Sequence, residues 1–138
     1  MIVKQLTDMS DILKLVPIEV ALRAKEKTDV PIKDVLTFIQ HQLSNPYFGI
    51  WGVFDDDKML GYVSAYANIV ESTREVYIWR IWHDPHHNEV MPVLHNVLKE
   101  FGKMTKAKKA RIEVTRGMKA LERKWGWKPK SVIMELEV

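Results

Sequence analysis

The stretch from Phe48 to Trp82 constrains the fold most, because three segments rich in aromatic and β-branched residues follow one another across short polar turns. Phe48 to Phe54 and Met59 to Ile69 flank the polar turn Asp55-Asp56-Asp57-Lys58, which predicts an antiparallel hairpin. A third strand is predicted over Val76 to Trp82, where aromatic residues on both faces indicate a central position. The middle of the chain therefore predicts an antiparallel sheet.

Helical patterns precede these strands. A short extended segment, Ile2 to Leu6, leads into a capped helix that we expect to run to about Arg23, with a break near Pro17. Apolar residues recur at helical spacing from Val35 to Leu43, which predicts a second helix.

The elements after the third strand alternate in type. The pattern predicts a helix around Val93 to Phe101, a strand over Ala110 to Thr115, a short helix over Met118 to Trp125 with a glycine cap at Gly126, and a closing strand over Ser131 to Val138. This order predicts an α/β (α+β) fold: a mixed, mostly antiparallel sheet of about six to seven strands, flanked by about four helices.

Length and composition restrict the class of protein. With 138 residues, the chain suits a single domain, residues 1–138. The absence of cysteine excludes disulfide frameworks, thiolate zinc sites and cysteine nucleophiles. No apolar run approaches the roughly 18 residues of a membrane span, and no signal-peptide core follows Met1, so we expect a cytoplasmic protein without a membrane partner.

Positive charge is concentrated in the second half of the chain. The net charge is only +3, but residues 99–130 hold 12 Lys or Arg and three acids. This asymmetry indicates either an anionic partner, such as phosphate groups, or an ordinary solvated helix surface. The sequence has no recognised nucleic-acid-binding module, so we do not expect nucleic acid as the partner.

The order of elements and four local motifs resemble the GNAT superfamily of acyl-CoA-dependent N-acyltransferases over essentially the whole chain. The motifs are Val3 to Asp8, the hairpin Trp51 to Tyr62, the proline-ended strand Ile81-Trp82-His83-Asp84-Pro85, and Ala120 to Pro129, which is similar to a family helix ending in Gly-Phe-Lys-Pro. The resemblance implies a GNAT-like N-acyltransferase that moves an acetyl (acyl) group from acetyl-CoA to an amine of an unidentified substrate.

The resemblance also implies where acetyl-CoA binds. The backbone of Ile81, Trp82 and His83 would pair with the pantetheine arm, and the loop His86, His87 and Asn88 would face the phosphates. The chain departs from the family in this loop, because the stretch 86–93 has no glycine and no arginine and contains Glu89 and Pro92. Glycines and free N–H groups are what such a loop uses to approach a pyrophosphate.

Two residues at the start of the proline-ended strand are the catalytic candidates. By the resemblance, Glu75 is the base that deprotonates the amine, and Tyr77 is a hydroxyl that could protonate the leaving thiolate, with Tyr66 as an alternative. The plainer interpretation is that Glu75 is a solvated carboxylate and that the tyrosines only pack.

The histidines near Pro85 raise the question of a metal. His83, His86 and His87 lie around Asp84, but consecutive histidines in a loop seldom point at one centre, so no metal is expected.

The spacing of Trp79 and Trp82 predicts opposite faces of the strand, so at most one of them could line a substrate groove.

A rival hypothesis is a GNAT fold that has lost catalysis and serves as a binding or structural module, as in some members encoded by bacteriophages. A further hypothesis is a homodimer in which exposed strands such as Phe48 to Phe54 pair between two copies of the chain. The enzyme hypothesis requires an open slot where the strand Val76 to His83 separates from the strand Ala110 to Thr115. If the side chain of Trp82 or His86 fills this slot, the enzyme hypothesis fails.

Overall fold

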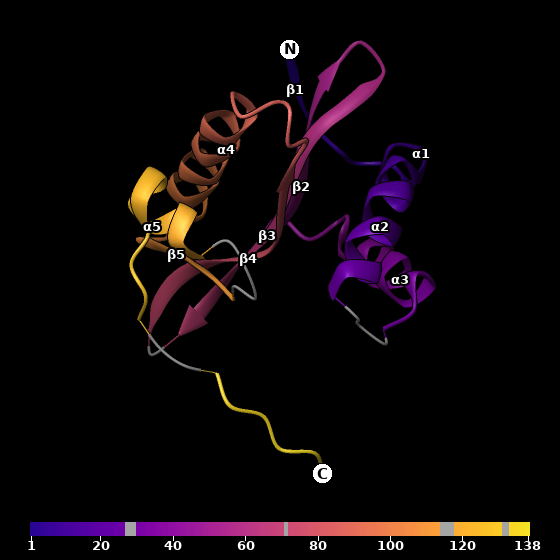
Figure 1. The fold of residues 1–138 in the computed structure, drawn as a ribbon. Coiled ribbons are helices and arrows are strands. Elements are labelled where there is room, and N and C mark those ends of the chain that lie inside the picture. Colours follow the sequence, from indigo (N-terminus) through magenta and orange to yellow (C-terminus); the bar gives the residue numbers. More distant parts are fainter. Residues whose placement is uncertain (27–29, 71, 114–117, 131–132) are drawn as a thin grey trace.

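The computed structural model describes residues 1–26, 30–70, 72–113, 118–130 and 133–138, and Figure 1 shows its fold. In chain order the elements are β1 (Ile2–Gln5), α1 (Met9–Ile12), the 3-10 turn η1 (Leu13–Leu15), α2 (Val16–Glu26), α3 (Ile32–Gln42), β2 (Phe48–Asp55), β3 (Lys58–Val70), β4 (Thr73–His83), α4 (Val90–Thr105), β5 (Lys109–Ile112) and α5 (Met118–Trp125).

The strands form one sheet with the order β1-β2-β3-β4-β5. All neighbours are antiparallel except β4 and β5, which are parallel. Helices α1 to α3 cover one face, and α4 and α5 lie on the other (Figure 1). The predicted fold class is therefore confirmed, although the described residues contain five strands rather than six or seven.

Each face of the sheet buries its own hydrophobic cluster. Val63, Ala65 and Ile78 point from the sheet toward α4, where Leu94 and Leu98 cover them. On the other face, residues of β2 and β3 pack against the N-terminal helices; this cluster contains Leu6, Ile12, Leu15, Val35, Ile39, Phe48, Ile50, Phe54, Met59 and Tyr62. Burying apolar area on both faces is the main force that holds helices to such a sheet.

The first helical segment begins and breaks where the sequence predicts. The carboxylate of Asp8 accepts a hydrogen bond of 3.0 Å from the backbone N–H of Asp11, which satisfies a donor at the start of α1. The tighter turn η1 then precedes Pro17, whose ring is tolerated in the first turn of α2. No helix among the described residues is both long and apolar enough to cross a membrane.

Helix α5 is attached to α4 through His95. The indole N–H of Trp127 donates to His95 Nε2 at 2.9 Å, and His95 Nδ1 lies 2.9 Å from the carbonyl of Met91, to which it must donate. The imidazole also stacks on Trp125 at a centroid distance of 5.0 Å. The predicted cap at Gly126 is confirmed, since this residue has φ +75°.

Strand β4 contains one extra residue, and this corrects a prediction. Ser64 pairs with Arg80 and Ala65 pairs with Ile78, so Trp79 is the unpaired residue of a β-bulge. The bulge shifts the alternation of side chains. Trp79 packs on Phe38 of α3, and Trp82 lies beside Tyr62 on the same face, so the predicted opposite faces are wrong.

The predicted closing strand is a second difference. Residues 131–132 lie outside the described part of the chain, and residues 133–138 form no strand. They extend away from the sheet (Figure 1), and Ile133, Met134 and Leu136 are exposed. Alternating apolar and acidic residues give this segment a strand-like pattern, but a strand also needs a hydrogen-bonding neighbour, which the described residues do not supply here.

Candidate functional site

The central feature of the candidate site is the point where β4 and β5 part. Their parallel pairing runs from Glu75 opposite Lys109 to Ile78 opposite Ile112. Strand β4 continues to His83, and among the described residues its part after Ile78 pairs with β3 alone, since β5 ends at Ile112. The end of the predicted strand at 114–115 lies outside the described residues. The bulge at Trp79 thus directly follows the last pair that β4 forms with β5 among the described residues.

The three strand residues predicted to hold the cofactor lie along this part of β4. Ile81 packs against the cluster under α4, whereas Trp82 packs on the opposite face against Tyr62. His83 is half-buried and its Nδ1 lies 2.8 Å from the carbonyl of Asp84. His86 is exposed. The described contacts therefore place neither Trp82 nor His86 between the two strands.

The loop before α4 uses much of its own hydrogen-bonding capacity. The backbone N–H of His86 donates to the carboxylate of Asp84 at 2.9 Å, and that of His87 donates to the Asp84 carbonyl at 2.9 Å. The N–H groups of Val90 and Met91 donate back to carbonyls within the loop. Few backbone donors therefore remain for a phosphate at this helix start.

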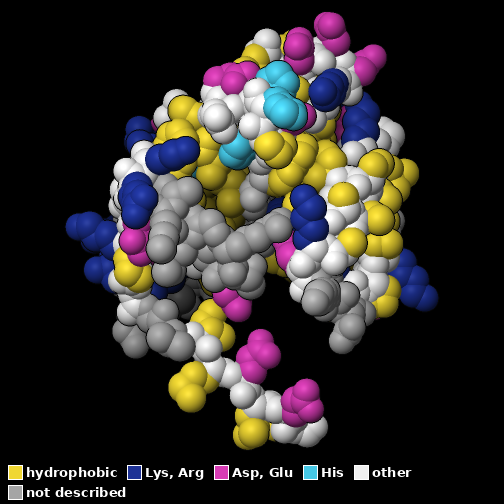
Figure 2. Space-filling view, in the orientation of Figure 1, with side chains coloured by type: hydrophobic (Ala, Val, Ile, Leu, Met, Phe, Trp, Pro, Cys, Tyr) yellow, Lys and Arg dark blue, Asp and Glu magenta, His cyan; other side chains and the backbone are white. Residues whose placement is uncertain are grey.

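Two carboxylates add negative charge to this loop. A hydrogen bond from His87, whose Nδ1 lies 2.9 Å from Glu89 Oε1, lowers the pKa of the Glu89 carboxyl. The backbone N–H of His86 is the main cause that lowers the pKa of Asp84. Both acids are therefore ionised at neutral pH. Figure 2 shows histidine side chains beside acidic ones at the upper end of this face.

The two predicted catalytic residues lie where β4 and β5 are still paired. Glu75 is buried, with 6% exposure, and both of its oxygens accept hydrogen bonds from Arg111 of β5. Tyr77 stacks on Tyr66 with the ring centroids 5.3 Å apart. Burial is the main cause that raises the pKa of Tyr77, followed by the charge of Glu113, so its phenol stays protonated at neutral pH.

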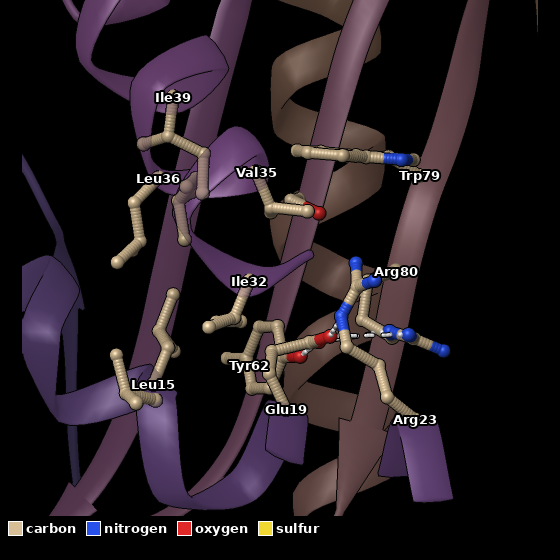
Figure 3. A pocket seen from close by; sticks show the side chains of 13 residues that line it. Leu15, Glu19, Arg23, Ile32, Val35, Leu36, Ile39, Tyr62, Trp79 and Arg80 are labelled. Carbon is tan, nitrogen blue, oxygen red and sulfur yellow. Dashed lines mark hydrogen bonds and ion pairs between the residues drawn. The ribbon is translucent and has the colours of Figure 1, made fainter. Parts of the chain in front are cut away.

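A buried ionic cluster next to the bulge was not predicted from the sequence. Arg80 donates to both oxygens of Glu19 on α2, from Nε at 2.9 Å and Nη2 at 3.1 Å (Figure 3). It also binds Glu26. The Tyr62 hydroxyl donates to Glu19 as well, and Arg23 Nε lies 3.3 Å from the same carboxylate.

The cluster also stabilises the charged form of Arg80. Burial by itself would lower the pKa of Arg80, but the bonds to Glu26 and Glu19 outweigh it and raise that pKa. The sequence contained one indication of this cluster, because Arg80 is the only charged residue in the otherwise apolar and aromatic segment Val76 to Trp82. Nothing in the sequence identified Glu19, which is 61 residues away.

This cluster forms one end of a pocket between α2, α3 and the sheet (Figure 3). Most of the pocket wall is apolar, with Ile32, Val35 and Ile39 contributed by α3. Trp79 and Arg80 line it from the bulge of β4. Among the described residues, no three His, Asp or Glu side chains are arranged so as to hold a metal ion.

No model of a protein family matches the sequence, and no curated protein matches it. Solved structures match nearly the whole chain. A predicted acetyltransferase from Clostridium acetobutylicum, solved with acetyl-CoA, is similar with a TM-score of 0.82 at 17% identity, covering 99% of this chain and 95% of that one.

Two aminoglycoside acetyltransferases are also similar. One, from an uncultured soil metagenomic sample and in complex with sisomicin, has a TM-score of 0.76 at 14% identity, covering 99% of this chain and 95% of its own. The other, an aminoglycoside 6'-N-acetyltransferase from Acinetobacter haemolyticus, has a TM-score of 0.77 at 13% identity, covering 100% and 98%. The chain therefore has the fold of these acetyltransferases, and the predicted GNAT fold is confirmed.

Proposed function

We propose that this chain is an N-acetyltransferase that moves the acetyl group of acetyl-CoA to an amine. The observation that supports this most is the parting of β4 from β5 after Ile78, at the bulge of Trp79. A strand that loses one neighbour offers backbone N–H and C=O groups to a ligand. A similar structure of the same fold contains acetyl-CoA.

The cofactor would lie along the end of β4. In this proposal the backbone of Ile81, Trp82 and His83 pairs with the amide groups of the pantetheine arm. His86, His87 and Asn88 supply side-chain donors to the phosphates, and the basic segment 99–130 attracts the anionic ligand. When bound, acetyl-CoA supplies the thioester from which the acetyl group is transferred.

Glu75 and Tyr77 carry the proton transfers in this proposal. Glu75 accepts, through a water molecule, the proton that the attacking amine loses as its nitrogen bonds to the acetyl carbon. Tyr77, whose raised pKa keeps it protonated, donates a proton to the sulfur as the carbon–sulfur bond breaks. Arg111 holds Glu75 in place on the neighbouring strand.

Replacing Glu75 with glutamine is therefore expected to lower the rate of acetyl transfer by about 100-fold or more, since a positioned base contributes at least this much. The release of the free CoA thiol measures the rate, and the affinity for acetyl-CoA should be unchanged. Glu100→Gln, on the exposed side of α4, is the matched control. A Glu75→Gln variant with the control's rate would remove Glu75 as the base.

The loop before α4 favours a second candidate function, a GNAT fold without catalysis that acts as a binding or structural module. The N–H groups of His86, His87, Val90 and Met91 already have acceptors within the loop. Glu89 places a negative charge where the phosphates would lie. This arrangement fits a pyrophosphate poorly, and only the binding of acetyl-CoA itself can decide between the two candidates.

If the phosphates do face this loop, Glu89 opposes them. Changing Glu89 to glutamine is then expected to tighten acetyl-CoA binding roughly threefold at low salt, because one like charge near the phosphates is removed. Calorimetric titration of both proteins measures this. The same change at Glu100, at the other end of α4, should have no effect. Equal affinities for all three proteins would show that the phosphates lie elsewhere.

A further inference from the structure

The C-terminal segment 133–138 exposes a row of apolar side chains. It extends away from the sheet of its own chain (Figure 1), and its exposed large hydrophobic residues are Ile133, Met134, Leu136 and Val138. Met134 is 90% exposed and Leu136 is 86% exposed. In an extended segment Met134, Leu136 and Val138 share one face, whereas Glu135 and Glu137 share the other. Such a segment gains stability when it pairs with the edge of a sheet that covers its apolar face.

The sheet offers two edges to such a segment. Among the described residues β1 and β5 are the outermost strands, and β2 lies between β1 and β3. The segment Phe48 to Phe54, for which pairing between two copies was predicted, is therefore not an edge strand. The only charged residue of β1 is Lys4, and its ammonium already lies 2.8 Å from the carboxylate of Asp11. A strand with two glutamates would thus find no uncompensated positive charge at the edge formed by β1.

The edge formed by β5 is strongly basic. The exposed cations of β5 and of the residues before it are Lys106, Lys108, Lys109 and Arg111, and the stretch 106–111 contains no acid. Lysines on an edge strand hold most other strands away, because pairing would place their charges against apolar or like-charged side chains. Opposite charges directly across two paired strands attract instead. A strand with alternating glutamates is therefore the kind of strand that this edge accepts.

The two faces of β5 differ in character. Ile112 packs on the hydrophobic cluster beneath α4, so the side chain of Ala110 points to the same face of the sheet. Helix α5 also lies over this face, where its Leu121 packs on that cluster. Ala110 is nevertheless exposed, which leaves room beside it for a further apolar strand. Lys109 and Arg111 point to the opposite face.

One alignment of the segment with β5 fits both faces at once. With Leu136 opposite Ala110, the apolar face of the segment continues the face on which Ile112 packs. Both glutamates then lie beside the basic side chains of the other face, Lys109 and Arg111. A shift by one residue would place the apolar side chains among these cations instead. The alignment fits both strand directions, because Leu136 lies midway between the two glutamates and Ala110 lies midway between the two bases.

The described residues that lead to the segment do not turn back toward β5 of their own chain. Trp127 is held on α4 by its hydrogen bond to His95, and residues 128–130 form no turn. Pro129 fixes its own φ and disfavours the helical conformation for Lys128, which keeps this connection extended. The segment consequently lies clear of the body of its own molecule (Figure 2), where a second molecule can reach it.

We propose that this protein forms a homodimer in which segment 133–138 of each copy pairs as a strand with the outer edge of β5 of the other copy. The exchange is reciprocal, so both segments are covered by the same contacts, as in the closed two-fold dimers that most homo-oligomers form. The second copy thereby supplies the closing strand that the sequence predicts and that the described residues of one chain do not form. This inference concerns assembly and does not depend on acetyl transfer.

Disulfide formation tests which residues meet, because the chain contains no cysteine of its own. Directly opposite residues of paired strands have Cα atoms about 4.5–5.5 Å apart, a distance that a disulfide spans. The variants Ala110→Cys and Leu136→Cys are mixed as dilute solutions, concentrated together and oxidised. We expect a linked pair with one copy of each variant, identified by its mass, as the main product.

The matched control replaces the partner edge. Val3→Cys on the edge strand β1, mixed with Leu136→Cys in the same way, should give only about a tenth as much linked pair, since its Cα would not lie opposite Leu136. Equal yields from the two mixtures would overturn the proposal.

The double variant Ala110→Cys/Leu136→Cys determines which copy supplies the strand. Exchange between copies gives a covalent dimer on a non-reducing gel. An oxidised monomer as the main product would show that the segment pairs with β5 of its own chain, and it would overturn the proposal. Thiols that stay free in both copies would also overturn it.

Analytical ultracentrifugation measures the assembly of the unchanged chain. We expect a dimer whose dissociation constant rises by about tenfold or more in Leu136→Lys, because the new charge would enter the apolar face of the pairing. Ile133→Lys is the matched control, since Ile133 is also exposed but points to the opposite face of the segment, and its effect should stay below about threefold. An unchanged chain that remains monomeric, or equal dissociation constants for the two variants, would overturn the proposal.

Discussion

Replacing Arg80 with methionine is expected to lower the free energy of unfolding by about 3 kcal/mol, the largest effect of any single change considered for this protein. The variant keeps the unbranched stem of the side chain but removes the guanidinium group, which leaves the Glu19 carboxylate, only 7% exposed, without its bidentate partner. Removing one member of a buried ion pair costs far more than the pair itself contributes, because the remaining charge stays desolvated.

Urea denaturation measures this change. With a slope of about 2 kcal/mol/M, the midpoint should fall by roughly 1.5 M. Lys103→Ala removes an exposed ion pair with Glu100, so it should change the free energy of unfolding by less than about 1 kcal/mol. Adding Glu19→Gln to Arg80→Met should restore part of the loss. Equal midpoints for Arg80→Met and Lys103→Ala would contradict the account of the buried cluster.

Changing Gly61 to alanine is expected to cost about 2 kcal/mol, because the new methyl group would overlap its neighbours. A Cβ at this position would lie 2.5 Å from Val90 Cγ1 and 2.8 Å from the backbone oxygen of Trp82. Relief requires the start of α4 or the end of β4 to shift. Since both elements would hold acetyl-CoA, the variant should also weaken its binding.

Gly102 provides the matched control. A Cβ there would meet nothing closer than 3.8 Å, and the residue lies inside α4, where alanine is favoured over glycine by up to about 1 kcal/mol. Gly102→Ala should therefore leave stability unchanged or raised. Thermal unfolding of both variants measures the contrast. A Gly61→Ala protein as stable as Gly102→Ala would show that α4 does not pack this closely on β3.

The regular elements could be predicted because their patterns are local. The hairpin from Phe48, the strand ending at Pro85 and the amphipathic helix α4 each carry their periodicity within one segment. Ile81 to His83 and His86 to Asn88 accordingly lie at the predicted strand end and loop. The composition of that loop, which lacks glycine and includes Pro92, also indicated that it would offer few backbone donors to a phosphate.

The features that shape the pocket could not be predicted in this way. The bulge at Trp79 depends on the pairing of β4 with β3, and no glycine or proline marks it in the sequence. The pair formed by Glu19 and Arg80 depends on how α2 packs on the sheet. The segment 133–138 failed for the opposite reason. Its local pattern predicts a strand, but the described residues provide no neighbouring strand for it to pair with.

Calorimetric titration of the whole chain with acetyl-CoA at low ionic strength tests whether this fold binds the cofactor. We expect saturable binding of one acetyl-CoA per chain, weaker in high salt because the phosphates contribute charge. We also expect weaker binding by Gly61→Ala than by Gly102→Ala. A folded protein that gives no binding heat up to millimolar acetyl-CoA would exclude acetyl transfer and leave the non-catalytic module as the function.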